Sequence, residues 1–286
     1  MKIALIGKGG MLGSDFSSVL KTTSHTVYAL DSADINITNP QSIQSALKTL
    51  SPEVIINCAA FTKVDACETE REKAYAVNGT GAGYLAAFCR EHHTKLVHFS
   101  TDYIFDGKKS APYLETDAPN PINHYGASKL AGELAILETL DTHYIFRIQW
   151  LYGHFGPHFI RTMVALSKTR TEFQVVEDQI GSPTWTMEVV KSVISALEAD
   201  APYGIYHLAN TGYTSWHNLA LFVFEQLGIQ ATVAPQTTDQ LSRPAKRPLN
   251  SRLNIQKYLD LGLYQPATWQ EAASTYLADD GASMIG

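Results

Sequence analysis

The sequence has few cysteines, no long apolar run and no excess of positive charge, and each shortage disfavours a class of protein. Its 286 residues contain three cysteines, Cys58, Cys67 and Cys89. An odd set without C-x-x-C spacing argues against a disulfide framework and against a zinc site. We therefore expect buried free thiols. We also predict no essential metal, because no cluster of carboxylates has recognisable ligand spacing.

Membrane proteins and nucleic-acid-binding proteins are disfavoured in the same way. No apolar run approaches the ~18 residues that a membrane-spanning helix needs, and Met1-Lys2 leads directly into the first expected strand, leaving no room for a signal peptide. The formal net charge is −6 and there is no basic run, so we expect no nucleic acid as a partner. The cytoplasm is the expected location. With 45% hydrophobic residues, the chain can bury one large domain and a smaller lobe.

A glycine-rich turn stands near the N-terminus, between an apolar run and an amphipathic stretch. Lys2–Ile6 has the pattern of a short buried strand, and Gly7–Gly13 follows it with G-x-x-G-x-x-G spacing. In such a turn Gly7 permits the tight bend, Gly10 lets backbone approach a pyrophosphate, and Gly13 lets the helix pack closely. The N-terminus of that helix offers N–H groups and a positive dipole to phosphate. The context favours a dinucleotide site over a merely flexible turn.

An acidic residue follows the second expected strand, Thr26–Leu30. This residue, Asp31, stands where a dinucleotide-binding unit places a carboxylate on the adenosine ribose. A carboxylate there repels a 2′-phosphate, so the sequence favours NADH over NADPH. Lys8, inside the glycine turn, could compensate that charge, which leaves use of both cofactors open. The alternative is that Asp31 only caps the turn into Ser32–Asp34.

A hydroxyl, a tyrosine and a lysine follow the fourth expected strand, Lys95–Phe99. Ser100 and Thr101 come directly after it, and Tyr125 and Lys129 lie four residues apart downstream. Positions i and i+4 share one face of a helix, so the Lys129 ammonium can lie beside the Tyr125 phenol. We expect this charge to lower the pKa of Tyr125 from its ordinary value of ~10 and make it a general acid or base. The spacing alone is weak, since such pairs also occur by chance on surfaces.

Expected strands and helices alternate in the first half of the chain, which is typical of α/β proteins. The sequence predicts a Rossmann-type doubly wound parallel sheet with a smaller C-terminal substrate-binding lobe. Residues 1–150 would form the dinucleotide-binding domain, and residues 151–286 mainly the lobe, interwoven with the sheet. The expected strands are Lys2–Ile6, Thr26–Leu30, Val54–Asn57, Lys95–Phe99 and Tyr144–Ile148, with helices at 11–21, 40–50, 68–91 and 124–140. Beyond residue 150 we expect short strands near Phe173–Val176 and Gly204–His207, and helices at 186–199, 215–227 and 268–278.

Two further features suit a substrate site at the carboxyl ends of these strands, where ligands bind in such folds. Trp150, at the end of the fifth expected strand, offers a flat face to a sugar or a base, although aromatic residues there often belong to the core. The tract 242–248 carries three positive charges among prolines. It could meet a diphosphate, and a solvated surface loop explains it equally well.

Six segments, taken in order, form a pattern far more specific than any one of them. They are Gly7–Gly13, Asn57–Asp65, Val77–Asn78, Ser100–Gly107, Tyr125–Lys129 and Asp178–Thr184. In these segments the chain resembles the extended short-chain dehydrogenases/reductases and, within them, the dTDP-4-dehydrorhamnose reductases. The resemblance covers nearly the whole chain. It implies an NAD(P)H-dependent oxidoreductase that reduces dTDP-4-dehydro-L-rhamnose to dTDP-L-rhamnose for polysaccharide biosynthesis, and it favours a homodimer.

The resemblance also assigns residues. Tyr125 would give its proton to the forming alkoxide, Thr101 would donate a hydrogen bond to the same oxygen, and Lys129 would hold the cofactor's ribose. The residues implied to bind the cofactor are Gly7, Gly10, Met11, Leu12, Gly13, Asp31, Asp34, Ile35, Ala60, Phe61, Thr62 and Phe99, with Tyr125 and Lys129 at the nicotinamide ribose. Those implied to face the sugar nucleotide are Thr101, Asp102 and Trp150.

Departures from the family pattern leave alternatives open. Cys58 stands where an alanine is usual, and Gln149 replaces a serine beside the sugar site, so the exact substrate is uncertain. Another sugar-nucleotide 4-ketoreductase is one alternative, and a 4-epimerase or 4,6-dehydratase is another. Tyr103 occupies the position of a dehydratase glutamate, which disfavours the dehydratase. A non-catalytic nucleotide-binding regulator is disfavoured because the full catalytic set is present.

Overall fold

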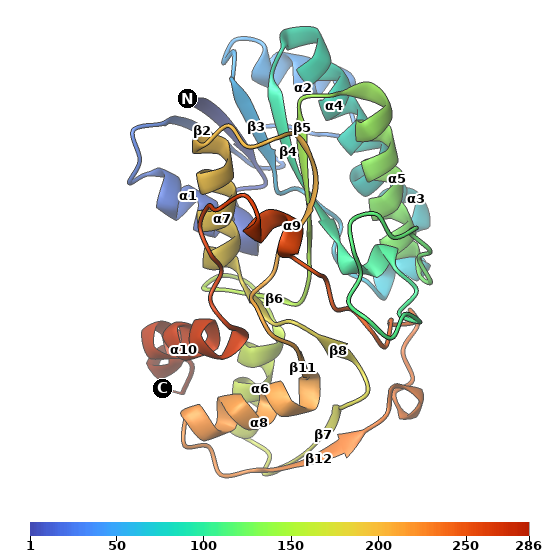
Figure 1. Cartoon of the computed structure of the whole chain (residues 1–286), viewed down its shortest axis with the longest axis vertical. Helices are drawn as coiled ribbons and strands as arrows, with labels where there is room; N and C mark the ends of the chain where they lie inside the picture. Colours follow the sequence, from blue (N-terminus) through green and yellow to red (C-terminus); the bar gives the residue numbers. More distant parts are fainter. Residues whose placement is uncertain (286) are drawn as a thin grey trace.

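A six-stranded parallel sheet forms the centre of the protein, in a computed structural model that describes residues 1–285 (Figure 1). The strand order is β2-β1-β3-β4-β5-β10, and every neighbouring pair is parallel. Successive connections change direction between β1 and β3, which is the point where such folds bind ligands. The strands are β1 (Lys2–Ile6), β2 (Thr26–Leu30), β3 (Val54–Asn57), β4 (Lys95–Thr101), β5 (His143–Ile148) and β10 (Gly204–His207).

Helices cover both faces of this sheet, so its strands are apolar on both sides (Figure 1). Side chains alternate along β1: Ile3 and Leu5 pack with α1 and α7, whereas Ala4 and Ile6 pack with helices of the opposite layer. The predicted three-layer α/β fold is therefore confirmed. The first layer contains α1 (Met11–Leu20) and α7 (Thr186–Glu198); the second contains α2 (Pro40–Leu47), α4 (Gly81–His92) and α5 (His124–Thr139).

A smaller lobe with a core of its own adjoins the sheet (Figure 1). Its core joins residues such as Ile160, Phe173, Leu219 and Tyr276. Two elements from the second half of the chain belong to the larger domain: β10 is a strand of the sheet, and α7 packs against it. The domain boundary at residue 150 stays a prediction. The lobe's helices are α6 (Phe159–Ser167), α8 (Trp216–Gln226) and α10 (Trp269–Ile285), its longer strands β7 (Glu172–Val176) and β12 (Thr232–Gln236), and its short strands β6 (Leu151–Tyr152), β8 (Ile180–Gly181), β9 (Thr184–Trp185) and β11 (Thr214–Ser215); α9 (Gln256–Leu259) packs beside β10.

The long helix expected at 68–91 is interrupted. The structure has the 3-10 turn η1 (Ala66–Glu68), the short helix α3 (Arg71–Tyr75), the π-helical turn η2 (Ala76–Thr80) and then α4. In η2 the side chain of Asn78 bonds to the backbone of Phe61, outside the helix. Single π turns inside helices are frequent at functional sites. Sequence analysis also missed α6, which His158 caps by accepting from the backbone N–H of Arg161.

Helix α5 packs so closely on the neighbouring backbone that only glycine fits at two of its positions. A Cβ atom at Gly126 would lie 2.0 Å from the carbonyl oxygen of Tyr103, and one at Gly132 would lie 2.2 Å from that of Asn78. Any larger residue would push the helix away from the sheet. The position of α5 relative to the end of β4 is thus fixed by backbone contact.

The surface and the thiols follow the expectations in part. Cys67 and Cys89 are buried free thiols, while Cys58 is half-buried and free.

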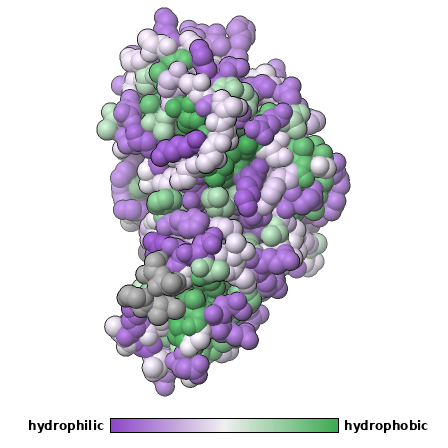
Figure 2. Space-filling view, turned by 90° about the vertical axis from the view of Figure 1, so that its left-hand side faces the viewer, coloured by the Kyte–Doolittle hydropathy of each residue, from purple (hydrophilic) through white to green (hydrophobic). Residues whose placement is uncertain are grey.

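No helix within residues 1–285 combines the length and apolarity needed to cross a bilayer. On the face shown in Figure 2, hydrophilic side chains surround separate apolar areas.

Candidate active site

The glycine turn after β1 forms a cradle of backbone at the start of α1. Gly7 has φ +86°, and its N–H donates to the carbonyl of Leu30 on β2. A Cβ atom at Gly13 would lie 2.1 Å from the Gly7 carbonyl oxygen, so the helix packs directly on the turn. No side chain caps α1 at Gly10, and the first turn of the helix has no acidic residue. The N–H groups at Met11 and Leu12 therefore suit a pyrophosphate.

Two carboxylates and one lysine lie at the end of β2. The Lys8 Nζ is 3.4 Å from Asp31 Oδ2 and 3.0 Å from Asp34 Oδ2. The backbone N–H of Asp31 is the main cause that lowers the pKa of Asp34, and Lys8 adds to it. Lys8 thus counters part of the negative charge where the adenosine ribose would lie. Ile35, expected to line the cofactor, is buried in the core between sheet and helices.

The loop after β3, which carries Ala60, Phe61 and Thr62, is tied to the catalytic helix by Asn78. The side-chain oxygen Oδ1 of Asn78 accepts from the backbone N–H of Phe61 at 2.8 Å. The side-chain NH₂ of Asn78 donates to the backbone carbonyl of Phe61 at 3.0 Å. The same amide donates to the Ser128 hydroxyl on α5 at 3.0 Å. Asn78 therefore positions a predicted cofactor loop against the predicted catalytic helix. In the sequence, Asn78 belongs to a family segment, Val77–Asn78, but no local pattern shows this role.

The predicted catalytic hydroxyls meet at the carboxyl end of β4. The Thr101 hydroxyl donates to Asp102 Oδ1 at 2.9 Å and accepts from Tyr103 N–H at 3.2 Å. It also contacts the Tyr125 phenol. The rings of Tyr103 and Tyr125 meet edge to face, 5.7 Å apart. Phe99, predicted to line the cofactor, packs in the core against Phe16 and Phe146.

The pKa of Tyr125 differs from the expectation. Burial raises it above its ordinary value, and the contact with Thr101 lowers it only in part. The largest influences on this pKa do not include Lys129, and the net shift is upward, so the expected lowering of the pKa is wrong. Burial decides the direction here because removing a phenolate from water is costly, and spacing along a helix does not reveal that cost. The phenol stays protonated, which is the form that a proton donor needs.

Lys129 is also buried, with 2% of its surface exposed. Burial lowers the pKa of Lys129 to about 8, although Glu133 and Cys58 act in the opposite direction. Its Nζ lies 3.4 Å from Nε2 of His98, a buried histidine of β4. Sequence analysis gave His98 no role, because a histidine within an apolar strand carries no signal of its own.

Unpartnered polar atoms surround the hydroxyls. Asp102 is 3% exposed, and its Oδ2 has no hydrogen-bond partner within the described part of the chain; the same holds for the hydroxyl of Ser100. Burial raises the pKa of Asp102 to about 7. Buried polar groups usually have partners, so these atoms suit the hydroxyl groups of a sugar.

Trp150 lies at the junction of the two lobes in an unusual backbone conformation. Its φ of +47° falls in the left-handed region, which is a strained position for a bulky residue. The indole stacks on Trp216 of α8 with ring centroids 3.7 Å apart. It also lies against Gly181, where a Cβ atom would be 2.5 Å from the ring. The predicted substrate contact is therefore held rigidly by the lobe.

A hollow of about 440 Å³ lies between the basic tract 242–248, Gln179 and Ile122, the residue before the N-cap of α5. Arg247, which lines it, pairs with Asp65 at 2.5 Å and contacts Tyr103 next to the catalytic phenol. The carbonyl of Lys246 accepts from Asn123, the N-cap residue of α5, at 2.8 Å. The basic tract 242–248 is thus joined to the catalytic helix. The hollow is lined by Ile122, Gln179, Thr238, Asp239, Leu241, Ser242, Arg243, Ala245, Lys246, Arg247 and Leu249.

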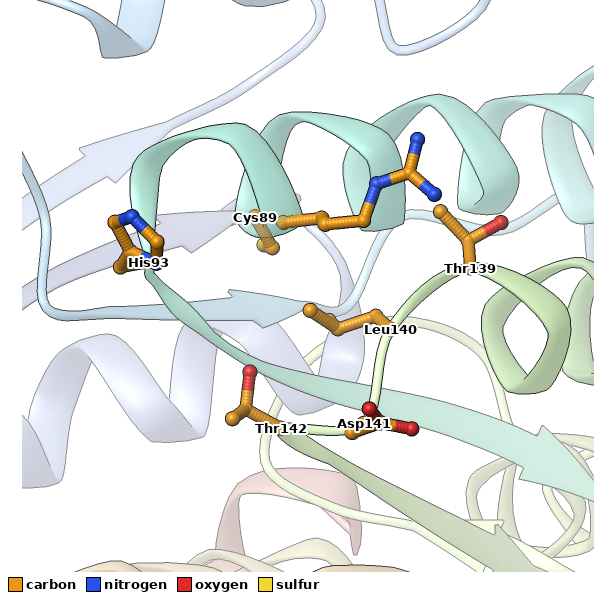
Figure 3. A pocket seen from close by; sticks show the side chains of 7 residues that line it. Cys89, His93, Thr139, Leu140, Asp141 and Thr142 are labelled. Carbon is orange, nitrogen blue, oxygen red and sulfur yellow. The ribbon is translucent and has the colours of Figure 1, made fainter.

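A second hollow of about 230 Å³ lies at the opposite end of the sheet (Figure 3). It is lined by Cys89 and His93 at the end of α4 and by residues 139–142 before β5. Because these residues adjoin the amino ends of β4 and β5, this hollow is separate from the catalytic groups. Residues 1–285 contain no cluster of three or more histidine, cysteine or acidic side chains that could hold a metal ion.

Comparison with known proteins agrees with this geometry. The family model described as RmlD substrate binding domain matches residues 1–281. A dTDP-4-dehydrorhamnose reductase of Streptomyces griseus is 41% identical over 93% of this chain and 90% of its own length. The chain belongs to the dTDP-4-dehydrorhamnose reductase family. The predicted resemblance is confirmed.

Two further members show the range of this family. A dTDP-4-keto-6-deoxy-D-glucose reductase of Streptomyces niveus is 38% identical, with 93% of each chain covered. The crystal structure of dTDP-4-dehydrorhamnose reductase from Bacillus anthracis in complex with NADP is 37% identical, with a TM-score of 0.94, and the match covers 98% of this chain and 100% of that one. The fold and its family are therefore shared over nearly the whole length.

Replacing Asp102 by asparagine should change stability in a pH-dependent way. Between the unfolded pKa near 3.8 and the folded pKa of about 7, the folded protein holds a proton on Asp102 that the unfolded chain lacks. The contribution of Asp102 to the free energy of unfolding of the wild-type protein is therefore larger at acidic pH, and it is lost as pH rises through about 7. We expect the free energy of unfolding of Asp102→Asn, relative to wild type, to be higher at alkaline than at acidic pH.

Chemical denaturation at about pH 5 and about pH 8.5 measures this difference, in the range where the linkage operates. Asp141→Asn, at an exposed carboxylate before β5, is the control and should show no such trend. If the free energies of unfolding of Asp102→Asn and wild type differ by the same amount at both pH values, the pKa of Asp102 is not raised in the folded protein.

Proposed function

We propose that this protein reduces the 4-keto group of dTDP-4-dehydro-L-rhamnose to give dTDP-L-rhamnose, with a nicotinamide dinucleotide as reductant. The observation that carries the proposal is the meeting of Tyr125 and Thr101 at the carboxyl end of β4, next to a backbone cradle for a pyrophosphate. Membership of the family named for this reaction supports it. The protein is therefore assigned as an oxidoreductase.

The chain's own residues hold the cofactor and the sugar in place and supply a proton. When bound, a reduced nicotinamide would supply the hydride for C4 of the keto sugar. Tyr125, kept protonated by burial, gives its phenolic proton to the oxygen that becomes the hydroxyl. The Thr101 hydroxyl, which donates to Asp102 in this structure, would turn its proton to that oxygen as negative charge develops there. The cradle from Gly7 to Gly13, the loop of residues 60–62 and Lys129 hold the cofactor.

The substrate's nucleotide end fits the hollow lined by the basic tract. Arg243, Lys246 and Arg247 line it, and the guanidinium of Arg247 lies next to Tyr103, whose ring touches that of Tyr125. A diphosphate bound there would place its sugar toward Thr101 and Asp102. Arginine suits this role because its planar group can bind phosphate oxygens in pairs. Trp150 would bound the sugar on the side of the smaller lobe.

A second candidate is the reduction of another dTDP-4-keto-6-deoxy sugar. The 38% identical relative named for dTDP-4-keto-6-deoxy-D-glucose favours it. The amide Nε2 of Gln149 is buried without a partner in the described structure, at a place where the family usually has serine. Such an amide can select a differently oriented sugar hydroxyl.

The homodimer and the cytoplasmic location stay predictions. Exposed Leu134 and Leu137 on α5 offer an apolar contact for a second copy.

Replacing Tyr125 by phenylalanine should remove the proton donor and little else. We expect kcat to fall by about 100-fold or more, the usual contribution of a positioned acid, while cofactor binding is kept. Steady-state rates and a fluorescence titration with NADH measure the two effects. Tyr84→Phe, at an exposed tyrosine of α4, should keep full activity. A near-normal kcat in Tyr125→Phe would exclude the acid role.

We propose that the enzyme prefers NADH and also uses NADPH. Asp31 would repel a 2′-phosphate, and Lys8 offsets that repulsion through its ion pairs with Asp31 and Asp34. Replacing Asp31 by asparagine should therefore raise kcat/KM for NADPH and lower it for NADH. Initial rates with both cofactors measure the ratio, and Glu138→Gln on the exposed side of α5 is the charge-matched control. An unchanged ratio in Asp31→Asn would rule out the carboxylate as the determinant.

A further inference from the structure

The indole of Trp150 is held between two parts of the smaller lobe. On one side the ring of Trp216 is stacked on it, with ring centroids 3.7 Å apart and an angle of 10° between the planes. The backbone of Gly181 also touches the indole, because a Cβ atom at Gly181 would lie 2.5 Å from Cε2 of the ring. Only a residue without a side chain can approach a ring so closely.

The distances at Gly181 show that its backbone lies over the face of the indole and not beyond its edge. The Cβ position is 2.5 Å from Cε2, 2.8 Å from Cζ2 and 2.9 Å from Nε1, and the last two atoms are both bonded to Cε2. A point in the ring plane outside Cε2 would be nearer to these two atoms than to Cε2, whereas a point above Cε2 is farther from both. Because the two rings of the indole share Cε2, Gly181 blocks the centre of this face.

Gly181 and Trp216 cover opposite faces of the indole. The three atoms nearest to the Cβ position of Gly181 all belong to Trp150. If Gly181 were on the same side as Trp216, the stacked ring would itself be among the nearest atoms, since its centroid is only 3.7 Å from that of Trp150. Neither face of Trp150 is therefore free to receive a sugar ring.

Both contacts come from one unit of the lobe, in which β8, β11 and α8 lie together (Figure 1). Gly181 on β8 pairs with Thr214 on β11, and Trp216 begins α8 directly after β11. The ring of Trp216 also contacts that of Phe159 at the start of α6, with centroids 4.7 Å apart. The pairing of β8 with β11 thus fixes the space that the indole of Trp150 fills.

This arrangement explains the backbone of Trp150 and limits what its side chain can offer. A φ of +47° persists in a bulky residue only where its surroundings hold it there, and the contacts on both faces do so. Trp150 is only half-buried, and Ile148, two residues earlier, pairs with Thr101 in the sheet. With both faces covered, the part of the ring left for a ligand at this end of the sheet is its edge, which carries the Nε1–H donor.

We propose that Gly181 and Trp216 position Trp150 so that it meets the sugar with the edge of its indole and donates a hydrogen bond from Nε1, instead of stacking its face on the sugar. Trp216 is then a positioning residue for sugar binding. A donor on a fixed edge requires an oxygen at one place, so it distinguishes sugars more sharply than an apolar face does. The inference rests on the proposed reductase function and deepens it.

Replacing Trp216 by leucine should weaken binding of the sugar but not of the nucleotide. We expect the Kd for dTDP-L-rhamnose, measured by calorimetry, to rise about five-fold or more, the scale of a lost aromatic pair. The Kd for dTDP, which has no sugar on its diphosphate, should stay unchanged. Trp216→Phe keeps a stacked ring and should keep most of the affinity. A wild-type Kd for dTDP-L-rhamnose in Trp216→Leu would overturn the inference.

The control variant is Phe222→Leu on the same helix. It removes another ring contact of the lobe, with Trp269 at a centroid distance of 5.1 Å, and should leave both Kd values unchanged. An equal loss of dTDP-L-rhamnose binding in Phe222→Leu would mean that a loosened lobe, and not the stack on Trp150, causes the effect, which would also overturn the inference.

NMR spectra of wild-type protein test the edge contact without any change at Trp216. The chain has four tryptophans, and the indole N–H signal of Trp150 is identified by its loss in Trp150→Phe. Addition of dTDP-L-rhamnose should shift this signal, and addition of dTDP should not. Protons over the face of an aromatic ring move upfield, whereas protons beyond its edge move downfield. An upfield shift of the bound rhamnose protons would show face stacking and overturn the inference.

These outcomes separate the inference from the proposed function. A wild-type protein that binds neither dTDP nor dTDP-L-rhamnose would contradict the reductase proposal, and the sugar contact with it. A protein that binds both, but whose Trp150 signal does not respond to the sugar, would contradict the edge contact alone.

Discussion

The contact between α5 and the backbone around it is the constraint on which the proposed site depends. Gly126 and Gly132 let the helix touch the carbonyl groups of Tyr103 and Asn78, where a Cβ atom would collide. This approach brings Tyr125 to the hydroxyl of Thr101 and buries Lys129 against His98. A helix held one side-chain layer further out would leave both groups in water and apart from β4.

Burial also decides the electrostatics of the pair. It raises the pKa of Tyr125 and lowers that of Lys129, so each group moves toward its neutral form. A phenol that stays protonated suits donation of a proton. Lys129 contacts His98, which pairs with Asn57 in the sheet, and the charge of Glu133, which is paired with Arg147, opposes part of the lowering of the Lys129 pKa.

Much of this could be predicted from the sequence, because short apolar runs that end at glycine or a polar residue are distinct strand signals. The bounds of β1, β2 and β3 agree with the prediction, and β4 only extends it to Thr101. The break at η2 could not be predicted, since it depends on Asn78 reaching a distant loop. The pKa of Tyr125 was predicted with the wrong sign, because spacing along a helix reveals proximity but not burial.

Transfer of a labelled hydride tests the central claim, a reduction at C4 of the sugar by hydride from a nicotinamide. The protein is incubated with dTDP-4-dehydro-L-rhamnose and NADH that carries deuterium at both C4 positions, and the sugar product is examined by NMR. The account predicts dTDP-L-rhamnose with one deuterium at C4 of the sugar, formed in equal amount to the NAD⁺ released. A product without deuterium at C4, or no oxidation of the NADH, would contradict it.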